Sequence, residues 1–472
     1  MTVKLLWQMS AVDLAANIIG GEVSCEEAVT ATVERMRAVN PKLNAVVDDL
    51  SDDAIAQAKK HDDILAKSGP LGPLHGVPVT IKENVDQKGR ATPNGVEAYA
   101  GIIAPDDAPL VKNLKAAGAI VIGRTNTPEF SFRATTTNAL HGRTFNPWND
   151  TASSGGSSGG ASTAVMAGMG AIAHGNDIGG SLRYPAAATG AATVKPGLGR
   201  VPAWNPSQKA ERGLLAQVMS VQGVICREVR DVRAGMKALI QYDPHDPWMV
   251  PMGWDSPRPD GKIKVAFTKN TYEFDLHPAV EKALDTARDC LVDAGYEVIE
   301  ADMPELREAG RDGGKALFGE VNALLRGEIQ KHGTEELKSI FANYDAYFSP
   351  PEGTDLLLLM AKRNHYHRQF NLFFEKYPLV LTPFLPSPTY DWDRDAQGMD
   401  GVIETLGAGM YSVAFNYTGL PAGNIPANYN DGLPVGVQIV GPRFREDMIL
   451  DALEEIEARV GVMAERLFAR EA

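Results

Sequence analysis

The sequence predicts a single large α/β domain in which a β-sheet is covered by α-helices on both faces. Helical stretches alternate with short apolar runs along the 472-residue chain, and such alternation is typical of α/β folds. Residues 108–117 and 278–294 are expected to be helices that end at a glycine, and an apolar run of strand character follows them at 119–123 and 296–299. The sequence contains no repeat of fixed period, so it does not predict a solenoid fold.

The first elements are expected to be helices. Two segments, residues 10–13 and 24–27, have the Ser-x-x-acid pattern that caps the start of a helix, and helix-period apolar residues follow. A third helical stretch covers about residues 52–67 and ends before a Gly-Pro pair. We therefore expect the N-terminal helices to occupy about residues 10–68.

A buried strand should follow these helices. Residues 77–81 are mostly apolar, and Lys82 stands at their end. Residues 379–382 and 435–440 are rich in strand-forming side chains, so both halves of the chain are expected to contribute to one sheet. The Pro- and Asp-rich stretch 243–260 predicts a long surface connection within that domain rather than a domain boundary.

Composition limits the partners and the compartment. A formal net charge of −14 would repel a phosphate backbone, so we expect no nucleic-acid partner, and a small neutral or cationic ligand suits the charge better. The three cysteines, Cys25, Cys226 and Cys290, are too few and too far apart for a disulfide framework or a Cys-x-x-Cys metal site. No secretory leader is evident, and no apolar run approaches the ~20 residues of a membrane span. We expect a cytoplasmic protein without a membrane partner.

The most unusual segment is rich in glycine and serine. It covers residues 153–162, and a second glycine-rich run at 177–181 places Ser181 24 residues after Ser157. Gly/Ser runs are often flexible linkers. These two flank a helix-like stretch at 161–170 and lie between apolar segments, which argues against a linker.

Two other glycine-rich motifs are alternative interpretations of this segment. The Gly-x-Ser-x-Gly nucleophile elbow fits with either Ser157 or Ser158 at its centre, but any Gly/Ser-rich run can match that pattern by chance. An elbow also needs a preceding strand and a later acid and histidine, whereas residues 145–150 are turn-like and no later histidine stands out. The Gly-x4-Gly-Lys-Ser/Thr motif of a phosphate-binding loop does not occur.

The run that leads to Ser181 has a physical use. Residues with small side chains let successive backbone N–H groups turn toward one point, which is how an oxyanion hole is built. Each donor of this kind contributes about 3 to 4 kcal/mol of transition-state stabilisation. A serine at the end of such a nest lies where attack on a carbonyl carbon and binding of its oxygen can coincide.

Three blocks in this order resemble the amidase signature family. They are residues 76–84 around Lys82, residues 155–160 around Ser157, and residues 177–186 around Ser181. The resemblance covers most of the chain, is weak between about 243 and 370, and extends to residues 124–126, 146–148, 419–423 and 432–438. It implies a mixed, twisted sheet in one domain, residues 1–472, with a catalytic core at about 74–240. It also implies that a variable helical region at about 304–377 shapes the substrate pocket.

The resemblance implies a Ser-Ser-Lys triad. Ser181 would attack the amide, Ser157 would follow a cis peptide bond and relay the proton, and Lys82 would accept it. The backbone N–H groups of Ile178, Gly179, Gly180 and Ser181 would hold the tetrahedral intermediate. The resulting acyl-enzyme would then be hydrolysed by water.

A lysine can serve as a base only if its pKa is strongly lowered. At the ordinary lysine pKa of ~10.4, about one lysine in 2,500 is neutral at pH 7, so burial must lower the pKa by about three units. The position of Lys82 at the end of an apolar strand allows this. An exposed lysine in a solvated loop is the alternative.

Other polar residues near these blocks have supporting roles at most. We expect Asp177 and Arg183 to order the loop of Ser181 by hydrogen bonds, and Ser158 to support the glycine-rich turn. His365 and His367 stand two residues apart in a helical pattern, so they face different directions and are poor joint metal ligands. We expect neither a metal nor an organic cofactor.

Three functions stay open at this point. A stand-alone amidase that acts on a small-molecule amide fits best, and a homodimer is compatible with it. The A subunit of the tRNA-dependent amidotransferase, a glutaminase, is the first alternative, but residues 174–178 and Leu182 differ from the pattern of that branch, and residues 406–412 lack an acidic glutamine contact. The second alternative is a non-catalytic binding protein on the same fold. The apolar run 356–360 hints at an apolar substrate, and core packing explains it equally well.

Overall fold

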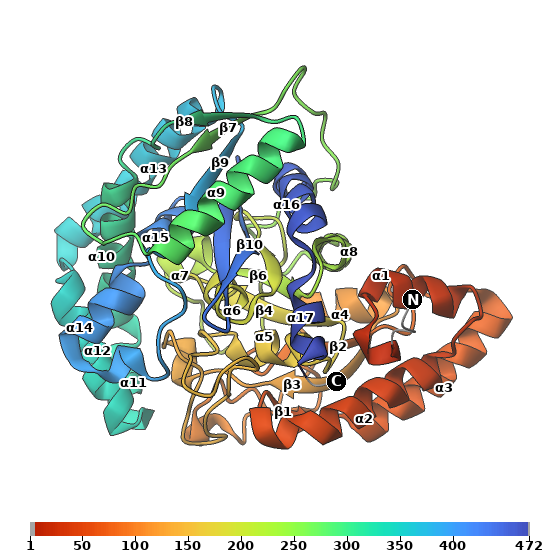
Figure 1. Ribbon diagram of the computed structural model, residues 1–472. Coiled ribbons are helices and arrows are strands. Elements are labelled where there is room, and N and C mark those ends of the chain that lie inside the picture. Colours follow the sequence, from red (N-terminus) through yellow and green to blue (C-terminus); the bar gives the residue numbers. More distant parts are fainter. Residues whose placement is uncertain (1–4, 471–472) are drawn as a thin grey trace.

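The computed structural model describes residues 5–470, and one β-sheet runs through this part of the chain (Figure 1). The described strands are β1 (Val46–Asp49), β2 (Pro78–Lys82), β3 (Ile120–Thr125), β4 (Ile172–Asp177), β5 (Ala192–Lys195), β6 (Val221–Cys226), β7 (Lys264–Phe267), β8 (Glu297–Glu300), β9 (Leu379–Pro383), β10 (Ala422–Asn430) and β11 (Leu433–Val440). Across the sheet they lie in the order β1-β3-β2-β4-β6-β5-β10-β11-β9-β7-β8. Both halves of the chain therefore contribute to one sheet, as the sequence predicts.

The sheet is mixed. Strand β2 is parallel to both of its neighbours, β3 and β4, and β7 is parallel to β8 and β9. The strands between these two groups pair antiparallel. The single-domain α/β fold with a mixed sheet is thus confirmed.

Alternating side chains of each strand enter two different cores. In β3, Val121 packs into the core on one face, whereas Ile120 and Ile122 pack into the core on the other. In β9, Leu379 and Leu381 enter the first core, and the residue between them points the opposite way. This period of two is what a strand buried on both faces requires.

Helices cover both faces. On one face lie α4 (Pro109–Ala116), α8 (Val229–Leu239), α9 (Pro278–Asp293) and α16 (Glu446–Val460). On the other lie α2 (Cys25–Leu43), α3 (Ser51–Ser68), α5 (Gly159–Met166), α6 (Arg183–Thr189), α7 (Leu214–Met219), α10 (Leu306–Leu324), α13 (Gly353–Phe374), α15 (Met410–Tyr417) and α17 (Met463–Ala469). Helix α1 (Ala11–Ile19) contributes side chains to both cores. The helical cover on both faces matches the prediction.

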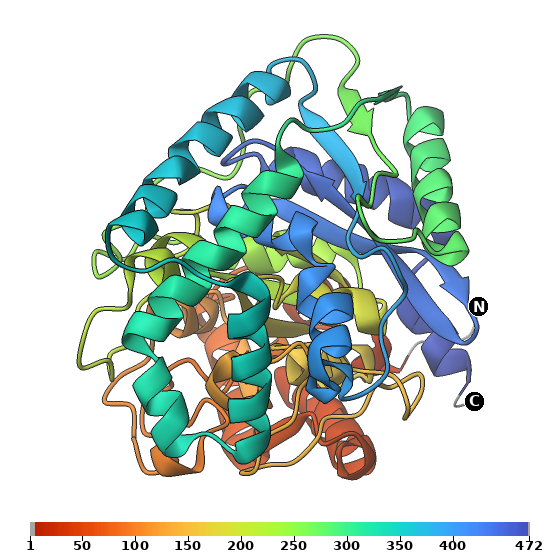
Figure 2. The ribbon, with the colours of Figure 1, turned by 90° about the vertical axis from the view of Figure 1, so that its left-hand side faces the viewer.

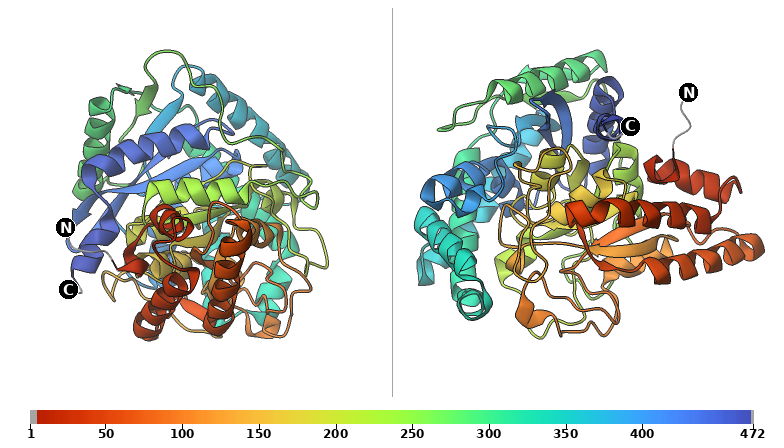
Figure 3. Two further views of the ribbon diagram at one scale, coloured as in Figure 1. Left: turned by 90° about the vertical axis from the view of Figure 1, so that its right-hand side faces the viewer. Right: turned by 60° about the horizontal axis from the view of Figure 1, so that its bottom comes forward.

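An outer helical layer adds to the second face. It contains α11 (Arg326–His332), α12 (Glu335–Phe348), α14 (Gly398–Val402) and the π-helix η5 (Ile403–Gly407). Figure 2 shows α10 to α13 together on one side of the molecule, and Figure 3 shows the N-terminal helices on the opposite side. The short 3-10 helices are η1 (Leu6–Gln8), η2 (Glu97–Tyr99), η3 (Glu129–Ser131) and η4 (Arg394–Ala396).

The helix starts follow the capping signals in the sequence. The hydroxyl of Ser10 accepts the N–H of Asp13 at the start of α1. Ser24 and Glu27 form a full capping box at the start of α2, in which each side chain accepts the other residue's backbone N–H. Both predicted starts are therefore confirmed, and α3 spans the third predicted helix.

Two short helices near the site are separate. The π-helix η5 ends at Gly407, and α15 begins at Met410. Gly409, between them, is so closely packed that an added Cβ would overlap the hydroxyl of Tyr184. The start of α15 therefore lies close to the ring of Tyr184, on helix α6 directly after Ser181.

Three further sequence features are the surface connection, the cysteines and the apolar content of the helices. Residues 240–263 contain no helix or strand, as expected for a surface connection, and Arg200 donates hydrogen bonds to the carbonyl groups of Met252, Gly253 and Trp254 in it. The three cysteines are buried and free. Among the helices of residues 5–470, none is both long enough and apolar enough to cross a membrane.

Candidate active site

Lys82 lies at the C-terminal end of β2, in the interior of the sheet. Its side chain is completely buried, because β3 and β4 flank the strand on both sides. Its Nζ atom lies 2.7 Å from Ser157 Oγ and 2.8 Å from Asn176 Oδ1. The predicted base and the predicted relay are therefore in direct hydrogen-bonding contact.

The surroundings of Lys82 favour the neutral amine. Burial lowers the pKa of Lys82 well below its ordinary value, although Asp177 and Glu83 oppose the shift. Behind the lysine, the ring of His174 is fully buried and forms a hydrogen bond with Gln222 through Nε2. Burial lowers the pKa of His174 to about 3, so this ring is neutral and adds no charge to the site.

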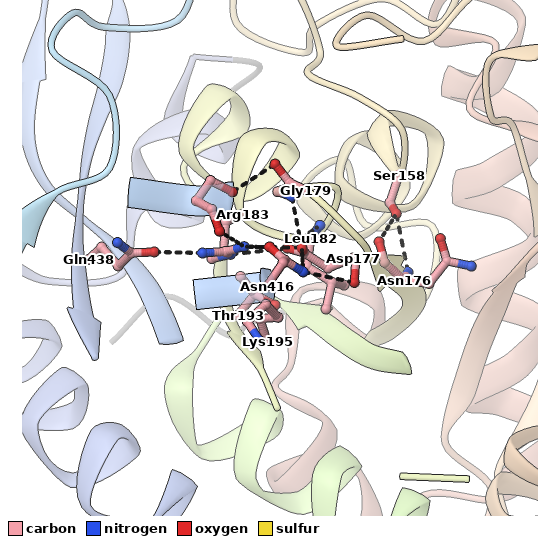
Figure 4. A network of polar contacts seen from close by, with 12 residues as sticks. Ser158, Asn176, Asp177, Gly179, Leu182, Arg183, Thr193, Lys195, Asn416 and Gln438 are labelled. Carbon is pink, nitrogen blue, oxygen red and sulfur yellow. Dashed lines mark hydrogen bonds and ion pairs between the residues drawn. The ribbon is translucent and has the colours of Figure 1, made fainter. Parts of the chain in front are cut away.

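Ser157 belongs to the loop before α5. The peptide bond between Gly156 and Ser157 is cis, which agrees with the feature that the family resemblance implies. Ser157 is 1% exposed, and its hydroxyl contacts the Lys82 amine. Its neighbour Ser158 is also buried, and its Oγ lies 3.3 Å from the carbonyl oxygen and 3.4 Å from the nitrogen of Asn176 (Figure 4). Ser158 therefore connects the loop to β4.

Ser181 lies in the turn between β4 and α6 and is partly exposed. Its carbonyl oxygen accepts a hydrogen bond from the N–H of Ser158 at 3.3 Å, so the two serine loops are in contact. Within residues 5–470, however, no hydrogen bond joins the hydroxyl groups of Ser181 and Ser157. Proton transfer between them requires that they meet when substrate binds, and catalytic hydrogen bonds often tighten only at that stage.

Asp177 organises the loop of Ser181. Its carboxylate accepts the N–H groups of Gly180 at 2.8 Å and Leu182 at 3.1 Å. Arg183 forms a fully buried ion pair with the same carboxylate at 3.0 Å, and Asn416 of α15 donates to it at 2.9 Å. Figure 4 shows these groups in one network that continues to Gln438 on β11. These contacts are the ones that the predicted role of Asp177 and Arg183 requires.

The carboxylate of Asp177 stays charged near neutral pH. Burial alone would raise the pKa of Asp177, but the charge and hydrogen bonds of Arg183 outweigh it and lower the pKa to about 2. Burial also lowers the pKa of Lys195, which lies near Asp177, to about 7.

One of the four predicted oxyanion donors is already engaged. The N–H of Gly180 donates to Asp177 and Gly180 is buried, whereas Ile178, Gly179 and Ser181 are partly exposed. Among the described residues, none accepts a hydrogen bond from the N–H groups of these three. The oxyanion hole stays a prediction: three of its four predicted N–H groups have no acceptor in this part of the chain, whereas that of Gly180 is taken by Asp177.

Gly180 can only be glycine in this turn. Its φ is +128°, in the region that L-residues rarely adopt, and an added Cβ would overlap the ring of Tyr184 and the hydroxyl of Ser412. We expect Gly180→Ala to lower the free energy of unfolding by about 2 kcal/mol or more. Gly179→Ala is the matched control, because a Cβ there meets open space, and its cost should stay within about 0.5 kcal/mol. Chemical denaturation measures both, and equal losses would contradict this prediction.

A cavity of about 300 Å³ lies beside the nucleophile loop. Helix α15 connects the two, because Met410 and Val413 line the cavity while Ser412 donates a hydrogen bond to the carbonyl oxygen of Gly179. The remaining lining residues come from α10, α12, η5 and the turn after α12: Gly310, Arg311, Lys315, Tyr347, Phe348, Ser349, Leu406 and Gly407. The cavity is therefore partly apolar and carries cations on one side.

The leucine run of α13 does not line this cavity. Leu357 is 66% exposed and Leu358 is 64% exposed, whereas Leu359 and Met360 pack against the core. The hint of an apolar substrate that this run gave therefore gains no support from this cavity and stays untested. Core packing on one side of the helix explains the run.

The two histidines of α13 do not share a ligand. His365 forms an ion pair with Glu305 at 2.9 Å, and burial lowers the pKa of the half-buried His367 to about 4. No cluster of three or more His, Cys, Asp or Glu side chains with metal-binding geometry was found within residues 5–470.

Sequence patterns missed several residues of the site. Asn176 contacts the Lys82 amine, and Ser412 and Asn416 hold the nucleophile loop from α15. The only signal was Asn176 itself, which stands next to Asp177 and departs from the pattern of the amidotransferase branch. Ser412 and Asn416 stand more than 230 residues from Ser181 in the sequence, and no local pattern connects them to it.

Comparison with known proteins shows the family of the chain. The family model described as Amidase matches residues 27–450. An indoleacetamide hydrolase of Bradyrhizobium diazoefficiens is 48% identical over 464 residues, which cover 98% of this chain and 88% of that protein. The A subunit of the glutamyl-tRNA(Gln) amidotransferase of Heliobacterium modesticaldum is 29% identical over 97% of this chain and 98% of that protein.

Solved structures share the fold over almost the whole chain. The structure of 6-aminohexanoate cyclic dimer hydrolase complexed with substrate matches with a TM-score of 0.83 and 26% identity. The match covers 97% of this chain and 99% of that chain. By sequence, the chain is thus more similar to a stand-alone amide hydrolase than to the amidotransferase protein.

Proposed function

This chain belongs to the amidase family and is a hydrolase of amide bonds, and we propose that it works through an acyl-enzyme on Ser181, with Lys82 as the base and Ser157 as the relay. The observation that supports this most is the buried Lys82 amine, whose Nζ lies 2.7 Å from Ser157 Oγ. Burial lowers its pKa, so the amine can accept a proton near neutral pH.

In the first half-reaction, Ser181 Oγ attacks the amide carbon and its proton passes to Ser157, whose own proton passes to Lys82. The carbonyl oxygen becomes an oxyanion against the N–H groups of Ile178, Gly179 and Ser181. The proton then returns from Lys82 through Ser157 to the leaving nitrogen as the C–N bond breaks. Ammonia or an amine leaves, and an ester joins the acyl group to Ser181.

In the second half-reaction, water replaces the amine. The same relay accepts a proton from water as the water oxygen attacks the ester carbon, and it returns the proton to Ser181 Oγ as the ester bond breaks. The net reaction converts one amide and one water into a carboxylic acid and an amine. Every proton transfer of the cycle passes through Lys82, Ser157 or Ser181.

For the substrate, we favour a primary amide of an arylacetic acid. The relative with 48% identity is an indoleacetamide hydrolase, and the cavity beside the nucleophile loop is lined in part by Phe348, Leu406, Met410 and Val413. A volume of about 300 Å³ lies within the range of small-ligand sites. An aromatic ring fits such a lining, and the methylene group would carry the amide toward Ser181.

Release of ammonia from a panel of amides tests this function. We expect the purified protein to hydrolyse indole-3-acetamide and phenylacetamide faster than acetamide, and glutamine most slowly. Ammonia assays at equal substrate concentration give the order. Lack of hydrolysis of every amide would exclude the function, whereas a preference for glutamine would favour the glutaminase of the amidotransferase branch.

A bulky residue in the cavity should affect aromatic substrates selectively. Leu406 is partly buried in the cavity wall, so Leu406→Trp is expected to lower kcat/KM for an arylacetamide by about tenfold or more, and that for acetamide much less. Leu357→Trp, on an exposed position of α13, is the control. Equal losses for both substrates in Leu406→Trp would exclude this cavity as the acyl pocket.

A further inference from the structure

We propose that Asn176 is a positioning residue for the base, because its side-chain oxygen holds one N–H of the neutral Lys82 amine and directs the lone pair toward Ser157. This inference rests on the proposed function. It concerns how the Lys82 amine is oriented, which the sequence positions of the catalytic residues do not specify.

The contact is built from the end of β4. Asn176 Oδ1 lies 2.8 Å from Lys82 Nζ, which also contacts Ser157 Oγ at 2.7 Å. The other half of the amide, Nδ2, donates to Asn84 Oδ1 at 2.9 Å. Both polar ends of the Asn176 side chain are therefore used, one by the base and one by the loop after β2.

A chain of hydrogen bonds runs in the direction that this orientation of Asn176 requires. Asn84 Nδ2 donates to Ser131 Oγ at 2.9 Å, and Ser131 Oγ donates to Asn94 Oδ1 at 2.6 Å. Because each group in this chain donates in the same direction, Asn84 presents its oxygen to Asn176. Asn176 then presents its NH₂ group to Asn84 and its oxygen to Lys82.

The far end of this chain has an unusual backbone. Asn94, Phe130 and Ser131 all have left-handed backbone conformations, with φ values of 51°, 54° and 55°, which are uncommon for residues other than glycine. The N–H of Phe130 donates to the carbonyl oxygen of Asn94 at 2.9 Å. Such conformations persist where the surrounding structure enforces them, and they gather near active sites.

This orientation has a chemical consequence for the base. An amide oxygen can only accept, so it binds an N–H of Lys82 and leaves the lone pair of the neutral amine free. The lone pair then faces Ser157 Oγ, from which it must take the proton. An inverted amide would instead offer an N–H to the lone pair and compete with Ser157 for it.

Asn176 Oδ1 is also an uncharged acceptor, so it does not stabilise the charged form of the Lys82 amine as a carboxylate would. The carboxylates nearest to Lys82 are Glu83 and Asp177. Glu83 accepts from the N–H of Gly95 and pairs with His141, and Asp177 is engaged by Arg183 and the nucleophile loop. The neutral ring of His174 accepts the backbone N–H of Lys82 through Nδ1 at 3.4 Å, and burial lowers the pKa of Lys195, near Asp177, to about 7. None of these groups forms a hydrogen bond with Lys82 Nζ in residues 5–470, whereas Asn176 and Ser157 do.

The test is the pH dependence of kcat/KM in Asn176→Asp. This change keeps the shape of the side chain and places a negative charge 2.8 Å from Nζ, which should stabilise the charged amine. We expect the acid limb of the profile to move up by at least one pH unit. Activity at pH values below both limbs then falls by about tenfold or more and recovers at high pH.

A second variant and a control keep the result decisive. Asn176→Ala should lower kcat at every pH by about tenfold or more while KM changes little, because the amine is no longer oriented. Asn371→Asp makes the same chemical change on the exposed side of α13, and its acid limb should match that of the wild type. An unmoved acid limb in Asn176→Asp, or full kcat in Asn176→Ala, would overturn the inference.

Failure of this inference differs from failure of the proposed function. If the wild type releases ammonia in a Ser181-dependent manner and the Asn176 variants behave like the wild type, only the positioning role is lost. If the wild type shows no such activity, the proposed function itself fails.

Discussion

Replacement of Ser181 by alanine is expected to remove amide hydrolysis, with a loss in kcat of at least about 10⁴-fold. No other hydroxyl group can take its place. Ser157 is 1% exposed and Ser158 is fully buried, whereas Ser181 is partly exposed at the end of the glycine-rich loop. The assay is ammonia release from an arylacetamide, with circular dichroism to verify the fold.

Ser158→Ala is the matched control for this prediction. Its hydroxyl contacts only the backbone of Asn176, at 3.3 and 3.4 Å, so we expect a loss far smaller than that of Ser181→Ala. If Ser158→Ala were as inactive as Ser181→Ala and Ser181→Ala kept its activity, the nucleophile-elbow alternative would return.

The second large effect is expected for Lys82→Met, which removes the base but keeps the length of the side chain. Without an acceptor, Ser157 cannot take the proton of Ser181, so kcat should fall by about 10³-fold or more. Steady-state kinetics measure this loss. Lys282→Met, which removes an exposed lysine on α9, is a control for loss of charge alone, and it should retain far more activity on a neutral amide.

Lys82→Met should also change how stability depends on pH. In the unfolded chain a lysine titrates near ~10.4, whereas burial lowers the folded-state pKa of Lys82 well below that value. Between the two pKa values the unfolded chain binds one proton more, so the free energy of unfolding of the wild type rises with pH. Each unit of depression corresponds to about 1.4 kcal/mol. The variant lacks this term, so its curve should be flatter up to about pH 10, and parallel curves would contradict the lowered pKa.

The sequence was most informative where the physical signal is local. The Ser24–Glu27 capping box and the apolar strand before Lys82 depend on neighbours within a few residues, and both elements are where the sequence predicts them. The glycine-rich run before Ser181 also predicted a turn with exposed N–H groups. These features need no knowledge of the rest of the fold.

Contacts between distant segments could not be predicted in this way. The N–H of Gly180 is taken by Asp177 because Arg183 and Asn416 hold that carboxylate in place, and Asn416 comes from a helix near the other end of the chain. The cavity likewise combines residues of 310–349 with residues of 406–413, and the second group lies outside the helical region that the sequence singled out. Long-range packing determines both the Gly180 contact and the cavity lining, and local residue patterns do not specify such packing.

The most direct test of the proton relay is the pH dependence of covalent labelling of Ser181 by a fluorophosphonate. Labelling reports the attack of the serine oxygen without departure of an amine. If neutral Lys82 accepts the proton through Ser157, the second-order rate constant should rise through one acid limb and reach a plateau, and Lys82→Met should label at least about 10²-fold more slowly. A rate that is independent of pH, or equal in the wild type and Lys82→Met, would contradict the relay.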